Sequence, residues 1–103
     1  MKLNDKVAVI TGSARGIGCA IAEAMAAEGA RVVITDRDGD AAAKTADRIG
    51  NGAIAVTADV SEPAAIEALF AEAVRAFGRI DILVNNAGIG APRLVVDIGL
   101  DEW

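Results

Sequence analysis

The sequence predicts an α/β fold in which a parallel sheet is covered by helices on both faces. Short apolar runs of strand length alternate with longer Ala-rich stretches whose apolar residues have helical spacing. The runs are continuously apolar, which is typical of strands that are buried on both sides. Each of the first three runs is followed by a helical stretch, and this order predicts parallel strands joined by right-handed crossovers.

The first half of the chain contains two strand–helix units. The apolar run Lys6–Thr11 predicts the first strand, and helical spacing over 17–25 predicts the first helix, which ends near Gly29. The β-branched run Arg31–Thr35 predicts the second strand. A weaker amphipathic pattern over Asp40–Ile49 predicts the second helix.

The second half contains a third strand, the best-defined helix and a fourth strand. The third strand is expected at Ala53–Ala58, after a Gly-Asn-Gly turn. Ser61 is expected to be the N-cap of the next helix, with Pro63 in its first turn. That helix has one apolar stripe, formed by Ile66, Leu69, Phe70, Ala73, Val74 and Phe77. The run Ile80–Val84 predicts the fourth strand, with an exposed outer edge.

Composition excludes several classes of protein and site. The 103 residues are enough for one small domain, and 53% hydrophobic residues exclude a disordered chain. The absence of His and the single Cys exclude a Ser-His-Asp site and a His- or Cys-based metal site, so no metal is expected. The net charge of −5 without a basic stripe predicts no nucleic-acid partner. No apolar stretch is long enough to predict a membrane span. The lone Cys indicates a cytoplasmic protein.

The last residues have the pattern of a helix that has only begun. In Leu100–Trp103, Asp101 is suited to cap a helix and Glu102 to lie in its first turn. One turn is not stable by itself, because helix nucleation is unfavourable. We therefore expect residues 1–103 to be a partial domain that is truncated at Trp103.

A glycine-rich loop joins the first strand to the first helix. Its sequence is Thr11-Gly12-Ser-Ala-Arg-Gly16-Ile-Gly18, with the spacing T-G-x-x-x-G-x-G. Glycines allow a tight turn and a close approach of the backbone to a ligand. The free N–H groups at the start of the helix favour a bound phosphate. The common dinucleotide pattern G-x-G-x-x-G and the Walker pattern are both absent.

This loop resembles the one in the short-chain dehydrogenase/reductase family. Three further motifs occur at family spacing and at successive strand ends: Asp36, Asp59-Val60 and Asn85-Asn86-Ala87-Gly88. The resemblance covers essentially the whole chain. It implies the N-terminal NAD(P)-binding part of a Rossmann-type doubly wound parallel sheet, with strand order 3-2-1-4 and helices on both faces.

The resemblance also implies a set of cofactor-binding residues. The glycine loop would hold the pyrophosphate and the neighbouring ribose, and Asp36 would accept hydrogen bonds from the adenosine ribose. Asp59 and Val60 would contact adenine. The implied set is Gly12, Ser13, Arg15, Gly16, Ile17, Gly18, Asp36, Arg37, Asp59, Val60, Asn86, Ala87 and Gly88. The alternatives are a purely structural turn for the loop and a strand-ending acid for Asp59.

Asp36 favours NAD over NADP. A carboxylate about 4 Å from a 2′-phosphate opposes it by about 4 kcal/mol per unit charge at an effective dielectric constant of about 20. Arg15 and Arg37 have the opposite effect, because a guanidinium binds phosphate well. We give Asp36 the greater weight and expect NAD as the cofactor.

Other chemically suggestive side chains are expected to be structural. Cys19 is expected to be a packed thiol, and Asn85 to connect neighbouring strands. Asp81 is expected at the mouth of a strand, without a ligand. Three acids are expected to be solvated: Asp38, Asp40 and Asp47.

The family transfers hydride between nicotinamide and a substrate alcohol or carbonyl, using a Tyr-x-x-x-Lys pair, a Ser and an Asn. This chain contains no Tyr, so no catalytic residue is carried over and the chain alone is not expected to be active. Residues 92–96 would border the nicotinamide pocket. We expect the complete protein to be an NAD-dependent oxidoreductase that acts on a small alcohol or carbonyl, such as a polyol, as a homo-dimer or homo-tetramer. The alternatives are a non-catalytic nucleotide-binding module and a phosphate-loop protein that binds another nucleotide.

Overall fold

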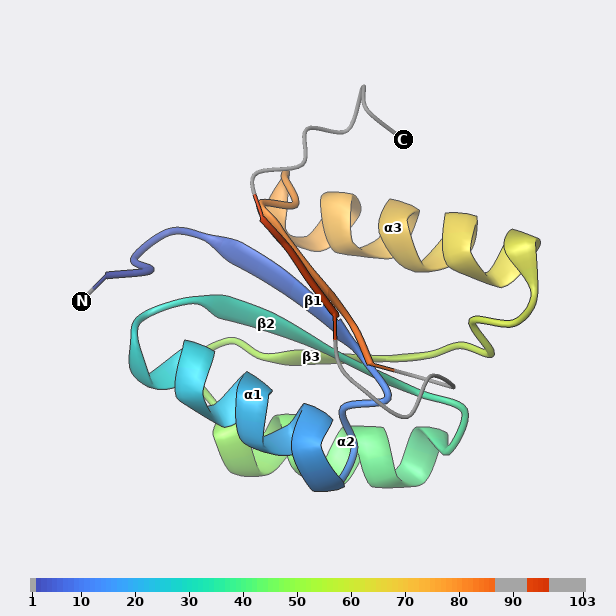
Figure 1. Cartoon of the computed structure of the whole chain (residues 1–103), viewed down its shortest axis with the longest axis horizontal. Coiled ribbons are helices and arrows are strands. Elements are labelled where there is room, and N and C mark those ends of the chain that lie inside the picture. Colours follow the sequence, from blue (N-terminus) through green and yellow to red (C-terminus); the bar gives the residue numbers. More distant parts are fainter. Residues whose placement is uncertain (1, 87–92, 97–103) are drawn as a thin grey trace.

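A single sheet lies at the centre of the fold, with strand order β3-β2-β1-β4-β5 in the described part of the chain (Figure 1). The computed structural model describes residues 2–86 and 93–96. The parallel strands are β1 (Val7–Thr11), β2 (Arg31–Asp36), β3 (Ile54–Thr57) and β4 (Ile82–Asn85). The predicted order 3-2-1-4 is therefore confirmed. The predicted end at Leu100–Trp103 lies outside the described residues.

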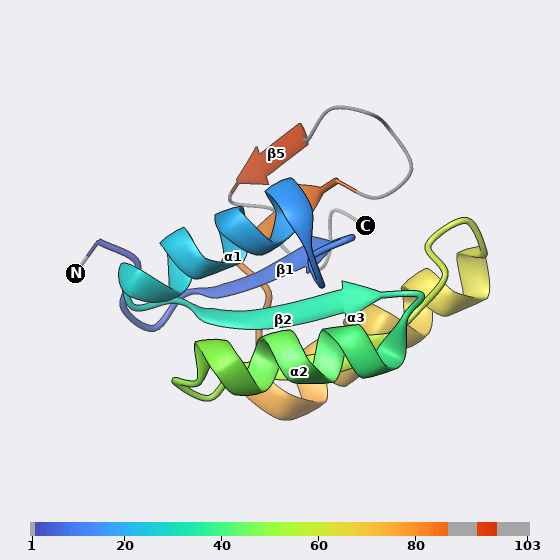
Figure 2. The same cartoon turned by 90° about the horizontal axis from the view of Figure 1, so that it is seen from below.

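A fifth strand covers the edge that was expected to be exposed. β5 (Arg93–Val96) pairs with β4 in antiparallel fashion, with Ile82 opposite Val96 and Asn85 opposite Arg93. Figure 2 shows its arrow running against that of β2. The expectation of an exposed β4 edge is wrong, because the backbone N–H and C=O groups of β4 on this side bond to β5.

The helices cover both faces of the sheet, as predicted (Figure 1). α1 (Gly16–Ala27) and α2 (Gly39–Ile49) lie on one face, and α3 (Pro63–Phe77) lies on the other. The reason is topological. The connections β1 to β2 and β2 to β3 step in one direction across the sheet, whereas β3 to β4 steps back, and right-handed crossovers place these helices on opposite faces.

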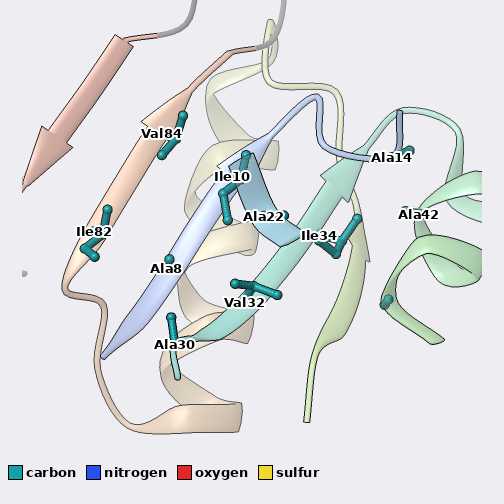
Figure 3. Packing of buried hydrophobic residues seen from close by; sticks show 11 residues of the cluster. Ala8, Ile10, Ala14, Ala22, Ala30, Val32, Ile34, Ala42, Ile82 and Val84 are labelled. Carbon is teal, nitrogen blue, oxygen red and sulfur yellow. The ribbon is translucent and has the colours of Figure 1, made fainter. Parts of the chain in front are cut away.

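The core has two layers because successive strand residues point to opposite faces. Val9, Val33 and Leu83 pack against α3, together with Leu69 and Ala73 of that helix. The other layer faces α1 and α2 and is drawn in Figure 3. Its strand residues are Ala8, Ile10, Val32, Ile34, Ile82 and Val84, and its helix residues include Ala22 and Ala42. Small helix residues let α1 and α2 approach the β-branched strand surface closely.

The start of α3 differs from the prediction. Glu62, not Ser61, is the N-cap, and its side chain makes no capping hydrogen bond. Pro63 is the first helical residue, as its fixed φ angle favours. The hydroxyl of Ser61 instead donates to Asp59 Oδ1 at 2.7 Å. In the part of the chain that the structure describes, no helix is long and apolar enough to cross a membrane.

Candidate functional site

The glycine loop between β1 and α1 is anchored from beneath by buried hydroxyl groups. Ser13 Oγ donates to the carbonyl of Ile10 at 2.6 Å and accepts the N–H of Thr35 at 2.9 Å. Thr45 Oγ1, from α2, donates to the carbonyl of Ala14 at 2.6 Å. The Ser13 side chain is completely buried, so it stabilises the loop from within.

α1 begins directly after the loop, and no side chain caps its N-terminus. Arg15 is the N-cap residue in extended conformation, and its side chain makes no capping hydrogen bond. The first turn of α1 contains no acidic residue. The first N–H groups of a helix have no partner within the helix, and the helix dipole makes this end positive. The N-terminal end of α1 therefore has the electrostatic character of an anion site. Ile17, beside it, is 60% exposed.

Two glycines shape this turn. Gly16 has a φ angle of +66°, which residues other than glycine rarely adopt. At Gly18, a Cβ atom would lie 2.4 Å from the carbonyl oxygen of Gly12 and 2.8 Å from Asn86 Nδ2. Gly18 is therefore required by a close approach of three segments, namely the end of β1, the start of α1 and the end of β4.

Two side chains clamp the end of β4 to the glycine loop. Thr11 Oγ1 accepts the backbone N–H of Asn86 at 2.9 Å, and Asn86 Nδ2 donates to the carbonyl of Gly12 at 3.1 Å. Thr11 Oγ1 also lies 3.4 Å from Asn85 Oδ1, so Asn85 connects neighbouring strands as predicted. Thr11 was not among the expected site residues. Its place at the head of the T-G-x-x-x-G-x-G motif was the available signal.

Asp36 is held next to the glycine loop at the end of β2. Its Oδ2 accepts the N–H of Ala14 at 3.3 Å, and its Oδ1 accepts the N–H of Asp38 at 3.2 Å. The side chain is half-buried and lines a cavity at the carboxyl end of the parallel strands. Backbone donors therefore fix the direction of this carboxylate at the edge of the sheet.

Asp38 is not simply a solvated acid. Its Oδ1 accepts the N–H of Ala41 at 3.1 Å and caps α2. Its Oδ2 accepts a hydrogen bond from Arg15 Nη2 at 2.7 Å. The hydrogen bond from Ala41 and then that from Arg15 hold the pKa of Asp38 below its usual value. The expectation of a purely solvated residue is corrected here, whereas Asp40 and Asp47 are exposed as expected.

Asp59 is organised by the turn that follows β3. Its Oδ1 accepts hydrogen bonds from the Ser61 hydroxyl at 2.7 Å and from the Ser61 N–H at 3.0 Å. These bonds, with a smaller contribution from the charge of Arg37, lower the pKa of Asp59. The carboxylate is therefore kept ionised.

A cavity of about 770 Å³ opens at the carboxyl end of the parallel strands. It includes the point between β1 and β4 where the strand order reverses, which is where open α/β sheets bind ligands. Six of its lining residues were predicted: Gly12, Asp36, Arg37, Asp59, Val60 and Asn86. Its apolar part was not predicted and consists of Ala58, Ile66, Leu69, Phe70 and Leu83.

The remaining predicted residues do not line this cavity or lie outside the described residues. Arg15, Gly16, Ile17 and Gly18 form the start of α1 beside it and are not among its lining residues. Ala87 and Gly88 lie outside the described residues, as does Pro92 of the predicted nicotinamide border. In the described ranges 2–86 and 93–96, no group of three or more acidic or Cys side chains could hold a metal ion.

The thiol of Cys19 and the carboxylate of Asp81 have structural roles. Cys19 is buried in α1, where its Sγ lies 3.4 Å from Glu23 Oε1 and accepts from Arg48 Nη2 at 3.0 Å. Asp81 lies before β4, at the opposite edge of the sheet from the cavity, and accepts the N–H of Val7 at 2.8 Å. Both therefore have protein partners, and neither lines the cavity.

Comparison with known proteins identifies one family of similar sequences. The family model described as short chain dehydrogenase matches residues 6–103. Sorbitol dehydrogenase from Cereibacter sphaeroides is 50% identical over 103 residues, which is 100% of this chain and 40% of that protein. Galactitol 2-dehydrogenase from Agrobacterium fabrum is 54% identical over 89 residues, which is 86% of this chain and 35% of that protein.

A solved structure has the same fold. The 3-ketoacyl-(acyl-carrier-protein) reductase from Brucella melitensis, crystallised with NADH, superposes with a TM-score of 0.82 at 49% sequence identity. The match covers 84% of this chain and 36% of that one. The chain thus spans about 40% or less of the length of these relatives.

Proposed function

This chain belongs to the short chain dehydrogenase family, and from that premise we propose that it forms the adenosine and pyrophosphate part of the NAD(H) site of an oxidoreductase. The observation that carries the proposal is the cavity at the carboxyl end of the sheet, with acids on its rim and the uncapped start of α1 beside it. Residues 1–103 would be the N-terminal part of the cofactor-binding domain.

The start of α1 is suited to the pyrophosphate. The N–H groups of its first turn would donate to phosphate oxygens, and the positive end of the helix dipole would favour their charge. The absence of a side chain at Gly18 lets the start of α1 lie against Gly12 and Asn86, which both line the cavity. The exposed Ile17 would become covered when the dinucleotide continues towards nicotinamide.

The cavity is suited to adenosine. Asp36 would accept hydrogen bonds from the ribose hydroxyls, since its carboxylate is already directed by the N–H groups of Ala14 and Asp38. Asp59 would accept a hydrogen bond from the adenine amine. The apolar surface of Ile66 and Phe70 would contact the adenine ring. Asp36 would also disfavour a 2′-phosphate by charge repulsion, which makes NAD(H) the preferred cofactor.

Bound nicotinamide would supply hydride exchange with a small alcohol or carbonyl substrate. A polyol is the class that best fits, because the relatives described above include a sorbitol and a galactitol dehydrogenase. This chain has no Tyr, so the proton-transfer residues of the complete protein would lie elsewhere. We expect the complete protein to act as a homo-dimer or homo-tetramer.

The test is to titrate the purified protein that contains this chain with NADH and NADPH, and to measure NAD reduction with sorbitol and galactitol. We expect tighter binding of NADH and turnover of at least one polyol. In Asp36→Ala, the preference for NADH should fall at least tenfold. One third of the repulsion energy of about 4 kcal/mol already corresponds to about a tenfold change in affinity. The exposed Asp47→Ala is the control and should leave the preference unchanged.

Two results would contradict this proposal. Equal use of NAD and NADP by the native protein would remove the assigned role of Asp36. Binding of NADH without turnover of any alcohol or carbonyl would favour a non-catalytic nucleotide-binding module.

A further inference from the structure

An ion pair joins the glycine loop to the residue that precedes α2. Arg15 Nη2 lies 2.7 Å from Asp38 Oδ2, and the side chains are 69% and 51% exposed. Arg15 precedes the first residue of α1, whereas Asp38 precedes the first residue of α2. The pair therefore joins the N-terminal ends of two neighbouring helices, next to the carboxylate of Asp36.

Asp38 is the fixed partner in this pair. Its other oxygen accepts the N–H of Ala41, and its own N–H donates to Asp36 Oδ1. The Arg15 side chain, by contrast, makes no capping hydrogen bond to α1. The position of the guanidinium is therefore determined by Asp38, because that residue is held at its backbone N–H and at its Oδ1, whereas the long Arg side chain has no capping bond.

The charge of Arg15 matters because of its place beside Asp36. A free guanidinium there would attract a phosphate in bidentate fashion and would offset the repulsion by Asp36. The second cation of this region, Arg37, is also electrostatically coupled to an acid, since its charge contributes to the low pKa of Asp59. Arg15 is thus paired with a carboxylate, and the charge of Arg37 acts on another.

We propose that Asp38 is a positioning residue for cofactor selection, which holds and neutralises Arg15 so that adenosine with a free 2′-hydroxyl is preferred to adenosine with a 2′-phosphate. This inference rests on the proposed function, and it assigns part of the selectivity to the ion pair in addition to Asp36. While Asp38 holds Arg15, the carboxylate offsets the guanidinium charge that would otherwise attract a 2′-phosphate.

The variant Asp38→Asn separates this role from the structural one. Asn has the same shape and remains a good N-cap, so α2 should keep its start. The lost charge frees Arg15, and we expect the Kd of the complete protein for NADPH to fall roughly three- to fivefold, the range of an exposed ion pair. The Kd for NADH should change less than twofold. Asp38→Glu, which keeps the charge, should retain the native ratio of the two constants.

Two controls identify the partner. Asp40→Asn removes the same charge from the first turn of α2 at an exposed side chain, and it should leave the NADPH-to-NADH ratio unchanged. In an Arg15→Gln background, Asp38→Asn should no longer improve NADPH binding, because the cation that it frees is absent.

The outcomes distinguish this inference from the proposed function. An unchanged ratio in Asp38→Asn, an equal effect of Asp40→Asn, or an effect that persists in Arg15→Gln would each overturn the inference while NADH binding remained. A native protein that binds neither dinucleotide would overturn the proposed function, and this inference with it.

Discussion

Replacement of Gly18 by Ala is expected to displace the glycine loop and to weaken NADH binding. The added Cβ would lie 2.4 Å from the carbonyl oxygen of Gly12 and 2.8 Å from Asn86 Nδ2. The first contact is with backbone, which cannot rotate away. Since Asn86 Nδ2 donates to the same carbonyl at 3.1 Å, one methyl group opposes both partners of a hydrogen bond.

The magnitude follows from three contributions. Overpacking a tight site costs about 1–3 kcal/mol, and loss of the hydrogen bond between Asn86 and Gly12 costs about 1 kcal/mol. The higher helix propensity of Ala returns up to about 1 kcal/mol. We therefore expect the free energy of unfolding to fall by about 1–3 kcal/mol. A displaced loop should also weaken NADH binding at least tenfold, because the N–H groups that we propose to bind the phosphates move with it.

The assay combines urea unfolding with fluorescence titration of NADH in the protein that contains this chain. Gly39→Ala is the matched control, since it also places a Cβ at the start of a helix. Its contact at 2.4 Å is with the side-chain oxygen of Thr57, which can rotate. We expect that control to be the milder change, with NADH affinity within twofold of the native value. If Gly18→Ala bound NADH as tightly as the native protein, the close approach would not be needed for the site.

Three further outcomes are expected. Thr35→Val should raise the free energy of unfolding by about 1 kcal/mol, because the buried Thr35 Oγ1 has no hydrogen-bond partner among the described residues and Val has nearly the same shape; a fall in the urea midpoint would contradict this. Asn86→Asp should destabilise the protein by about 1–3 kcal/mol, because an isosteric acceptor replaces the donor to the Gly12 carbonyl; Asn86→Asp with native thermal stability would show that this clamp is unimportant. At Asp81, burial raises the pKa, but hydrogen bonds from Arg79 and Val7 and the charges of Arg79 and Lys6 outweigh it, so the pKa lies below its usual value of 3.8. The stabilisation by this carboxylate is thus complete above the unfolded pKa and is lost as pH falls through the lower folded value. The difference in melting temperature between native protein and Asp81→Asn should therefore be constant above pH ~5 and shrink below pH ~4, and a difference that is independent of pH would rule this out.

The sequence by itself predicted the features that depend on local pattern. The period of apolar residues distinguished the buried strands from the helices, and the alternation of strands and helices predicted a parallel sheet. The family resemblance implied the order 3-2-1-4 that the sheet has. Parallel strands end at one edge, so the motifs at Gly12, Asp36, Asp59 and Asn86 were expected to meet there, and they line one cavity. Periodicity and crossover handedness are short-range rules, which is why a single sequence is enough for them.

Only the tertiary structure decided which side chains contact one another within the site. Arg15 and Asp38 are 23 residues apart, and Thr11 and Asn86 are 75 residues apart, so no local pattern pairs them. Ser13 has the same appearance in the sequence as a ligand-binding loop residue, yet its hydroxyl is buried between Ile10 and Thr35. The direction of a side chain and the partner that its polar atoms meet depend on how separate elements pack. Local propensity determines the elements, and packing determines the contacts on which cofactor selection would depend.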